Sequence, residues 1–302
     1  MPSEFDVVTG GFGYSGGYIA RALIAGGTRV RTLTNHPRVD DALARQLEIA
    51  PFNFGRPDDL ARSLEGAGTL FNTYWIRFPH RGVDFAQAVR NLRVLIDAAK
   101  RAGVHKFVHV SITNANSASP LPYFAGKGAI EEYLASSGLA YAIVRPAIIF
   151  GAEDILLNNI GWLLRRMPLF AIPGDGSYRV QPVFVEDLAN LAIDAARGSA
   201  NQTIDAVGPE TFTFNEVVGL IAKALGSHAL ITHLPPAAVL ASAWLIGRAT
   251  RDVVLTGDEI RGLMAGLLVS SGAPTAPTRF TDWLRRHVEF FGVRYASEVA
   301  RR

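Results

Sequence analysis

The sequence predicts an α/β protein built on a doubly wound parallel sheet, with a smaller and mostly helical C-terminal lobe. Short apolar segments alternate with helical patterns over the first half of the 302-residue chain. Glycines stand where these helices should end, and from about residue 214 onward the pattern is mainly helical. Such alternation is typical of parallel strands that are covered by helices on both faces.

Six strands and five helices are predicted in the first half. The strands are expected at residues 5–9, 29–34, 47–52, 69–74, 106–111 and 140–145. The helices between them are expected at residues 17–25, 39–46, 57–64, 83–102 and 124–136. The pair Gly26-Gly27, Gly103 and Gly138 follow the first, fourth and fifth helices, where a left-handed C-cap favours glycine.

The second half begins where this alternation weakens, after Gly151. Prolines and glycines interrupt the chain before another strand and helix, at residues 183–185 and 186–196. We therefore expect a first domain over residues 1–152, completed by the chain's return at about 181–205, and a smaller lobe over 153–302. Helices in this lobe are predicted at residues 214–224, 237–246, 256–268 and 281–290.

The most apolar segment, residues 237–246, is too short to cross a membrane. As a helix it would extend ~15 Å against a hydrocarbon core of ~30 Å, so we expect a buried helix and no transmembrane segment.

Composition and charge exclude several classes of function. With no cysteine and 49% hydrophobic residues, the chain is neither a disulfide scaffold nor a thiol enzyme, and a reducing cytoplasm is the expected compartment. The first residues lack a basic region followed by an apolar one, so no signal peptide is expected. Residues 279–302 carry six arginines against three acidic residues, a net +3 that equals the charge of the whole chain. We interpret them as a solvated terminus and expect no nucleic-acid partner.

A glycine-rich turn follows the first predicted strand and opens the first helix. Both G-x-G-x-x-G (Gly11, Gly13, Gly16) and G-x-x-G-x-x-G (Gly10, Gly13, Gly16) fit it. Glycine allows the tight turn and the close approach of a pyrophosphate, which the helix N-terminus attracts. The turn, with Tyr14 and Ser15, therefore predicts a dinucleotide site in a Rossmann domain.

Two alternatives to the dinucleotide site stay open. One is a glycine-rich turn that binds nothing. The other is a G-x-S-x-G nucleophile elbow over residues 13–17, although an elbow normally follows several strands.

The end of the second strand bears on the choice of cofactor. An acidic residue usually holds the adenosine ribose of NAD at this point, but here the chain continues Thr34-Asn35-His36-Pro37-Arg38. Asp40 and Asp41 are expected inside the next helix. Because no carboxylate repels a 2′-phosphate and Arg38 is near, NADP is slightly favoured over NAD, with Asn35 and Arg38 as candidate contacts.

A tyrosine and a lysine lie one helical turn apart, as Tyr123 and Lys127. A nearby ammonium favours the phenolate and lowers the phenol pKa, so the pair can exchange a proton with a substrate hydroxyl while a nicotinamide carries hydride. An exposed helical Tyr–Lys pair without function is the alternative.

Two hydroxyls lie at the end of the fifth predicted strand. Ser111 or Thr113 could orient the substrate oxygen, although a serine that merely ends a strand is an alternative. His105 and His109 have metal-ligand spacing but lie across the start of this strand without a third ligand, so no metal is expected.

Together, the glycine turn, the Tyr123/Lys127 pair and the segment Arg145-Pro146-Ala147 up to Gly151 resemble the extended or atypical short-chain dehydrogenases/reductases. Within them the chain resembles the NAD-dependent epimerase/dehydratase group. It is most similar to the branch of the 39-kDa accessory subunit of respiratory complex I, through residues 109–116 and 181–188.

The resemblance implies roles for particular residues. Gly10, Gly13 and Gly16 would bind the pyrophosphate, Tyr123 would be the acid–base residue, and Lys127 would hold the nicotinamide ribose. Further cofactor-binding residues implied are Asn53, Asn72, Thr73 and Pro146. The lobe after residue 150 would close over the substrate, lined by Asp175, Tyr178, Arg179 and Gln181.

This chain also departs from the family pattern. Ile112 replaces the second hydroxyl of the usual pair after the fifth strand, only 12 residues separate Ser111 from Tyr123, and Asn53 replaces the usual aspartate.

Two functional hypotheses follow. The first is an NAD(P)-dependent oxidoreductase, epimerase or dehydratase that moves hydride at a secondary alcohol or carbonyl carbon of a small molecule, such as a sugar nucleotide. The second is a non-catalytic NAD(P)-binding structural or regulatory protein. The sequence leaves the oligomeric state open, with a homodimer or an association with a membrane complex as alternatives.

Overall fold

The computed structural model describes residues 4–38, 42–80 and 82–299, which form two compact units. The N-terminal unit comprises Met1–Pro146 and Glu186–Asp205, and the C-terminal unit comprises Ala147–Val185 and Ala206–Arg302. The first boundary thus falls six residues before the expected 152, and the returning segment begins at 186 instead of 181.

The N-terminal unit is built around a seven-stranded sheet of order β11-β6-β5-β4-β1-β2-β3. Neighbouring strands from β3 to β6 pair in parallel. The strands are β1 (Phe5–Thr9), β2 (Val30–Leu33), β3 (Leu47–Ala50), β4 (Ala67–Asn72), β5 (Lys106–Val110), β6 (Tyr141–Pro146) and β11 (Gln202–Ala206). The predicted doubly wound parallel sheet is confirmed.

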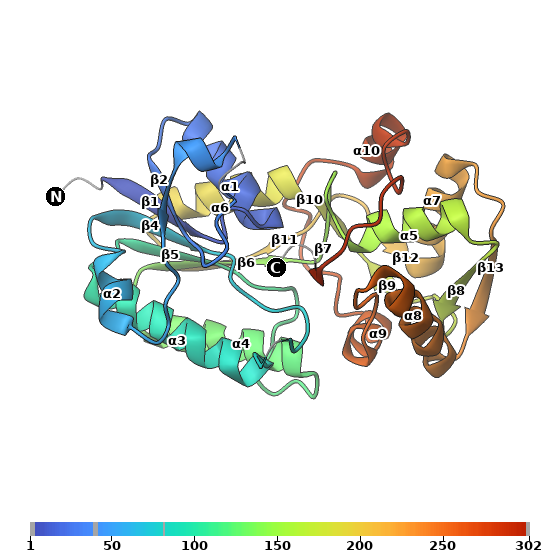
Figure 1. Cartoon of the computed structure of the whole chain (residues 1–302), viewed down its shortest axis with the longest axis horizontal. Coiled ribbons are helices and arrows are strands. Elements are labelled where there is room, and N and C mark those ends of the chain that lie inside the picture. The colour runs from blue at the N-terminus through green and yellow to red at the C-terminus, as the bar shows by residue number, and fades with distance from the viewer. Residues whose placement is uncertain (1–3, 39–41, 81, 300–302) are drawn as a thin grey trace. The chain divides into compact units, whose positions relative to one another are not determined.

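Helices cover both faces of this sheet, as Figure 1 shows with α1 and α6 on one face and α2, α3 and α4 on the other. The helices are α1 (Tyr14–Ala25), α2 (Pro57–Arg62), α3 (Phe85–Arg101), α4 (Pro122–Ser136) and α6 (Val185–Arg197). Buried aliphatic and aromatic side chains of β1, β4 and β5 pack with those of α3 and α4 in one core, where Leu70, Leu92 and Phe107 are fully buried. Burial of such side chains is the main force that holds helices on a sheet.

Three of the helix ends follow the glycine signals in the sequence. Gly27, Gly103 and Gly138 all adopt positive φ. In the predicted helix 39–46, residues 39–41 lie outside the described residues, Asp40 and Asp41 among them. The described part holds only a 3-10 turn, Ala44–Gln46.

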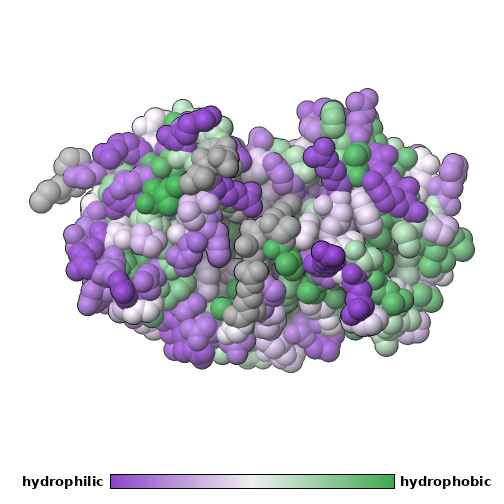
Figure 2. Space-filling view, viewed as in Figure 1, coloured by the Kyte–Doolittle hydropathy of each residue, from purple (hydrophilic) through white to green (hydrophobic). Residues whose placement is uncertain are grey.

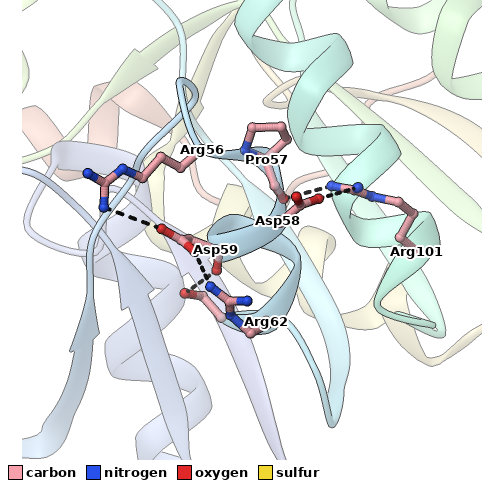
Figure 3. A network of polar contacts seen from close by, with 7 residues as sticks. Arg56, Pro57, Asp58, Asp59, Arg62 and Arg101 are labelled. Carbon is pink, nitrogen blue, oxygen red and sulfur yellow. Dashed lines mark hydrogen bonds and ion pairs between the residues drawn. The ribbon is translucent and has the colours of Figure 1, made fainter.

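Charged side chains hold the short helix α2 in place (Figure 3). Pro57 occupies its first turn, and Asp58 and Asp59 follow, as the helix dipole favours. Arg101 at the end of α3 donates to Asp58 Oδ1 at 2.7 Å and to the Pro57 carbonyl at 2.7 Å. Asp59 also pairs with Arg56 and Arg62, so this network ties the start of α2 to α3.

The described part of the C-terminal unit contains more helix than strand, but it also holds three two-stranded sheets, of which only the strand near residues 183–185 was predicted. These pair β10 with β7, β12 with β9 and β13 with β8. The strands are β7 (Ile148–Phe150), β8 (Leu169–Pro173), β9 (Arg179–Val180), β10 (Pro182–Phe184), β12 (Phe212–Thr213) and β13 (Leu230–Leu234). The helices are α5 (Leu156–Arg166), α7 (Phe214–Leu225), α8 (Pro236–Thr250), α9 (Gly257–Met264) and α10 (Phe280–His287).

The expectation that residues 237–246 form a buried helix is wrong. They lie in α8, which buries only Val239, Ala243 and Gly247. Trp244 and Leu245 are exposed, because their positions on the helix face away from the residues that pack inward. No helix among the described residues is long and apolar enough to cross a membrane.

Candidate functional site

The glycine turn between β1 and α1 needs glycine at several positions. Gly10 adopts φ +66°, a left-handed conformation that other residues rarely take. The Gly13 amide donates to the Gly10 carbonyl at 2.7 Å, which closes the turn. A Cβ on Gly16 would overlap the Gly10 carbonyl oxygen and approach Thr73 Oγ1 to 3.0 Å, and one on Gly11 would lie 2.7 Å from Thr32 Oγ1. A Cβ on Gly13 would lie 3.0 Å from the Gly10 carbonyl oxygen, so the turn disfavours a side chain at each of these four positions.

The N-terminus of α1 is suited to an anion. Gly13 is the N-cap and offers no side chain to the first amides of the helix, and the first turn contains no acidic residue. The positive end of the helix dipole at this point favours an external negative group. The turn therefore fits a dinucleotide pyrophosphate, and the absence of side chains at Gly13 and Gly16 makes room for it.

A chain of buried hydrogen bonds joins the carboxyl ends of three adjacent strands. Thr9 Oγ1 at the end of β1 donates to Asn72 Oδ1 at 3.1 Å and accepts from the Thr73 amide at 2.8 Å. Thr73 Oγ1 donates to the Thr9 carbonyl at 2.6 Å. Asn72 Nδ2 lies 2.8 Å from His109 Nδ1, its register partner on β5. Asn72 and Thr73 thus fix the edge of the sheet beside the glycine turn.

His109 is a fully buried neutral imidazole in this network. Asn72 Oδ1 accepts from Thr9, so Asn72 Nδ2 faces the ring and makes Nδ1 an acceptor. The proton then belongs on Nε2, which is buried without a hydrogen-bond partner among the described residues. Burial, and then the charge of Lys127, hold the pKa of His109 well below its usual range. His105 is exposed, so the two histidines do not form a ligand pair.

Lys127 is an almost completely buried lysine on α4. Its Nζ donates to the Val110 carbonyl at 2.8 Å and lies 4.8 Å from the centre of the Trp75 ring. Burial lowers the pKa of Lys127 to about 7, although Glu131 on the same helix opposes the shift. Glu131 is itself buried and paired with Arg145. A buried lysine whose pKa lies near 7 is unfavourable for folding and is typical of functional sites.

Replacement of Lys127 by methionine should stabilise the protein most at low pH. The pKa of this lysine is lowered in the folded state, so the unfolded chain binds more protons between pH 7 and 10 and the wild type gains stability as pH rises through this range. We expect the free energy of unfolding of Lys127→Met to exceed that of the wild type by about 1–3 kcal/mol at pH 6.5. This difference should shrink towards pH 10. Urea unfolding across this pH range checks the trend, and a difference that does not vary with pH would contradict a lowered pKa of Lys127.

Tyr123 is the second residue of α4 and is half-buried among aromatic rings. Its ring centre lies 5.9 Å from those of Trp75 and Phe85 and 5.6 Å from that of Phe124. Trp75 therefore contacts both Tyr123 and Lys127, a connection that no spacing in the sequence suggested. The tuning of the Tyr123 phenol by Lys127 stays a prediction, since Nζ is bonded to the Val110 carbonyl.

The two candidate hydroxyls lie just beyond β5. Their amides bond to the neighbouring strand, Ser111 to the Val144 carbonyl at 2.7 Å and Thr113 to the Pro146 carbonyl at 3.0 Å. Both residues are buried, and Ser111 Oγ has no hydrogen-bond partner among the described residues. An unpaired buried hydroxyl is costly, so Ser111 is the better candidate for contact with a bound molecule.

Asn35 and Asn53, which were predicted to contact the adenosine end of the cofactor, form hydrogen bonds with the backbone of nearby loops. Asn35 Nδ2 donates to the Phe52 carbonyl at 2.7 Å and Asn35 Oδ1 accepts from the Phe52 amide at 2.9 Å. Asn53 Oδ1 accepts from the Gly55 amide at 3.1 Å. These amides order the chain after β2 and β3, whereas Arg38 is exposed and available for an anion.

The four predicted substrate residues belong to the C-terminal unit. Two of them are buried and bonded within it, with Tyr178 Oη donating to the Pro173 carbonyl at 3.0 Å and Gln181 Nε2 to the Gly208 carbonyl at 2.9 Å. Burial raises the pKa of Tyr178, which disfavours an acid–base role. Asp175 accepts from Ser177, and Arg179 is exposed. Their contact with substrate stays a prediction.

Comparison with known proteins gives the family. The model of the NmrA-like family matches residues 7–264, which include the glycine turn, Tyr123 and Lys127. The chain belongs to the NmrA-like family.

The relatives of this NmrA-like protein include both a respiratory subunit and an enzyme. It is 24% identical to the NADH dehydrogenase [ubiquinone] 1 alpha subcomplex subunit 9 of Arabidopsis thaliana, over 88% of this chain and 71% of that one. It is 26% identical to the ceramide reductase of Caulobacter vibrioides, over 92% and 93% of the two chains. The resemblance to the complex I accessory subunit is confirmed.

Solved structures share the fold of this NmrA-like protein. The NADPH-dependent quinone oxidoreductase of Escherichia coli, solved with NADPH, has a TM-score of 0.75 and 21% identity and covers 94% of this chain and 100% of its own. A nucleoside-diphosphate-sugar epimerase from Staphylococcus aureus has a TM-score of 0.75 and 17% identity over 93% and 99%. The likeness to the epimerase group therefore extends to the whole fold.

Proposed function

We propose that this NmrA-like protein is an NAD(P)-dependent oxidoreductase that acts on a carbonyl or secondary alcohol. The observation that carries the proposal is the buried Lys127, whose pKa near 7 is unfavourable for the fold alone, one helical turn after Tyr123. The turn from Gly10 to Gly16, bordered by Thr73, would hold the pyrophosphate, and the bound nicotinamide would supply or accept hydride.

Residues of this chain would transfer the proton, bind the ribose and orient the substrate. In the reductive direction Tyr123 would give its phenolic proton to the substrate oxygen as the carbonyl carbon becomes tetrahedral. Lys127 would bind the ribose and stabilise the phenolate through its charge, and Ser111 Oγ would orient the substrate oxygen. Trp75, Phe85 and Phe124 would hold the phenol ring in place through the contacts described above.

A transfer experiment tests this chemistry across several classes of substrate at once. The protein is incubated with NADPH deuterated at C4 and with carbonyl substrates of three kinds, namely long-chain keto lipids, quinones and keto sugar nucleotides. These kinds follow from the names of the ceramide reductase, the quinone oxidoreductase and the epimerase. Deuterium on the former carbonyl carbon of an alcohol formed from a keto lipid or a keto sugar nucleotide, or oxidation of NADPH with formation of hydroquinone from a quinone, would support hydride transfer. Absence of reaction with every kind would count against an oxidoreductase.

A non-catalytic dinucleotide-binding role is the second candidate. It is favoured by the likeness to a complex I subunit and by Ile112, which replaces the second hydroxyl of the usual pair after the fifth strand. In this role the protein would bind NAD(P) and associate with a membrane complex. The cytoplasmic location stays a prediction under either candidate.

Arg38 should distinguish the two cofactors. It is exposed after β2, and no carboxylate follows that strand before it, so a 2′-phosphate would meet positive charge there. We expect Arg38→Ala to weaken NADPH binding about tenfold and to leave NADH binding unchanged. Arg45→Ala is the matched control, because Arg45 is exposed in the same stretch. Equal losses for both cofactors would remove the reason to prefer NADP.

A further inference from the structure

The outer face of α8 is apolar, which is unusual for a helix on a protein surface. Trp244 is 62% exposed and Leu245 is 63% exposed, and the neighbouring Ala237 and Ala241 are exposed as well. The inner face is closely packed at Gly247, because a Cβ there would lie 2.5 Å from the Asp252 carbonyl oxygen. The helix therefore cannot rotate to bury its outer face at this point. The exposure of Trp244 and Leu245 is therefore built into the packing of α8.

The apolar surface continues beside α8. Leu230 is 65% exposed and Leu169 is 46% exposed, and the two are register partners on β13 and β8. The helix packs against β8. Figure 2 shows hydrophobic residues gathered over α8 and the adjoining β8 and β13. We call Trp244, Leu245, Leu230 and Leu169 the α8 face.

The charges next to the α8 face are positive. No acidic residue occurs in α8, whereas Arg248 lies 5.6 Å from the centre of the Trp244 ring and Arg251 is the C-cap. Among the described residues neither arginine forms an ion pair.

The three carboxylates that follow α8 most closely in the sequence are engaged elsewhere. Asp252 is buried and accepts from the Glu298 and Val299 amides, Asp258 pairs with Arg261, and Glu259 caps α9. The α8 face thus combines an exposed indole and leucines with two arginines that pair with no carboxylate in the described part of the chain.

We propose that the α8 face docks this protein onto the surface of a phospholipid bilayer that contains anionic lipids. An indole prefers the boundary between headgroups and acyl chains, and arginine can extend from there to the phosphates. A helix of 15 residues spans ~22 Å and so lies in the interface and does not cross it. Docking would bring the protein to lipids in the membrane, whether or not it is a catalyst.

A second copy of the chain fits the α8 face less well. In a two-fold dimer through α8, Arg248 and Arg251 of both copies would gather in one interface, where the carboxylates described above are already engaged. Lipid phosphates supply the missing negative charge. The observations therefore favour the bilayer.

Flotation of the full chain with vesicles tests the proposal. We expect binding to vesicles of phosphatidylcholine and phosphatidylserine, and weaker binding to phosphatidylcholine alone or at high salt. Trp244→Ser with Leu245→Ser should lower the partition coefficient by about tenfold or more, and Arg248→Glu should lower it only for the anionic vesicles. Phe290→Ser is the control, since Phe290 is 78% exposed but lies beyond α10, and it should bind as the wild type does.

Quenching of Trp244 locates the contact directly. It is the most exposed of the four tryptophans, so lipids brominated on the acyl chains should quench the wild type strongly and Trp244→Phe much less, while Trp244→Phe still binds. Equal flotation of the wild type and the double serine variant, or no flotation of the wild type, would overturn the proposal. The proposal would also be overturned if the wild type forms a dimer and does not bind vesicles, and the double serine variant is a monomer.

Discussion

Gly16→Ala should abolish high-affinity NADPH binding while the protein stays folded, because the new methyl group enters the glycine turn itself. The new Cβ would overlap the Gly10 carbonyl oxygen and crowd Thr73 Oγ1, so the turn must open where the pyrophosphate would lie. We expect the dissociation constant for NADPH to rise by roughly 100-fold, with about 1–3 kcal/mol lost from the free energy of unfolding. Titration by cofactor fluorescence measures the first and urea unfolding the second.

Gly219→Ala is the control for this variant. Gly219 lies in α7 of the C-terminal unit, and a Cβ there meets no atom within 4 Å. The alanine should leave NADPH affinity unchanged and slightly stabilise the helix. If Gly16→Ala binds NADPH as tightly as Gly219→Ala does, the glycine turn is not the pyrophosphate site.

Tyr123→Phe should remove hydride transfer but keep cofactor binding. The substitution deletes only the phenolic oxygen, and the ring keeps its neighbours Trp75, Phe85 and Phe124. Loss of a general acid typically slows a reaction by about 10²–10⁴-fold, and we expect kcat for deuteride transfer to fall by this factor. The NADPH dissociation constant should change by less than about twofold, since the phenol contributes to the chemical step and not to cofactor binding.

Tyr133→Phe is the matched variant for this test. Tyr133 lies on the same helix α4 and donates to Asp97 at 2.8 Å, so its replacement likewise deletes one phenolic oxygen from this helix. It should leave the rate unchanged. A Tyr123→Phe protein that turns over as fast as Tyr133→Phe would show that the phenol of Tyr123 carries no proton in the reaction.

The fold could be predicted from sequence where local signals agree with each other. The strand at Phe5–Thr9 and the left-handed glycines Gly27, Gly103 and Gly138 were predicted correctly, because alternation and C-cap chemistry are local properties. The strand β11 was missed, since its residues Gln202–Ala206 include polar side chains and it occupies an edge of the sheet. The expectation that residues 237–246 are buried was wrong, because an apolar sequence does not indicate whether other residues cover each of its faces.

The candidate site was predictable only in part for the same reason. Tyr123 and Lys127 lie close in sequence, and their spacing is visible. The roles of His109 and Trp75 depend on contacts between β4, β5 and α4, which are distant in sequence. The register of Asn72 with His109 across β4 and β5 was the one signal that could have indicated the buried network, and it requires the strand pairing to be known.

The central claim is that the turn between β1 and α1 binds a nicotinamide dinucleotide, and a titration of the wild-type protein with NADPH and NADH tests it most directly. The account predicts saturable binding of both, tighter for NADPH, with energy transfer from the tryptophans to the reduced nicotinamide. Trp75 lies next to Tyr123 and Lys127, so it should give the strongest transfer of the four. If the protein binds neither NADPH nor NADH, the account of the glycine turn and every role assigned around it would be contradicted.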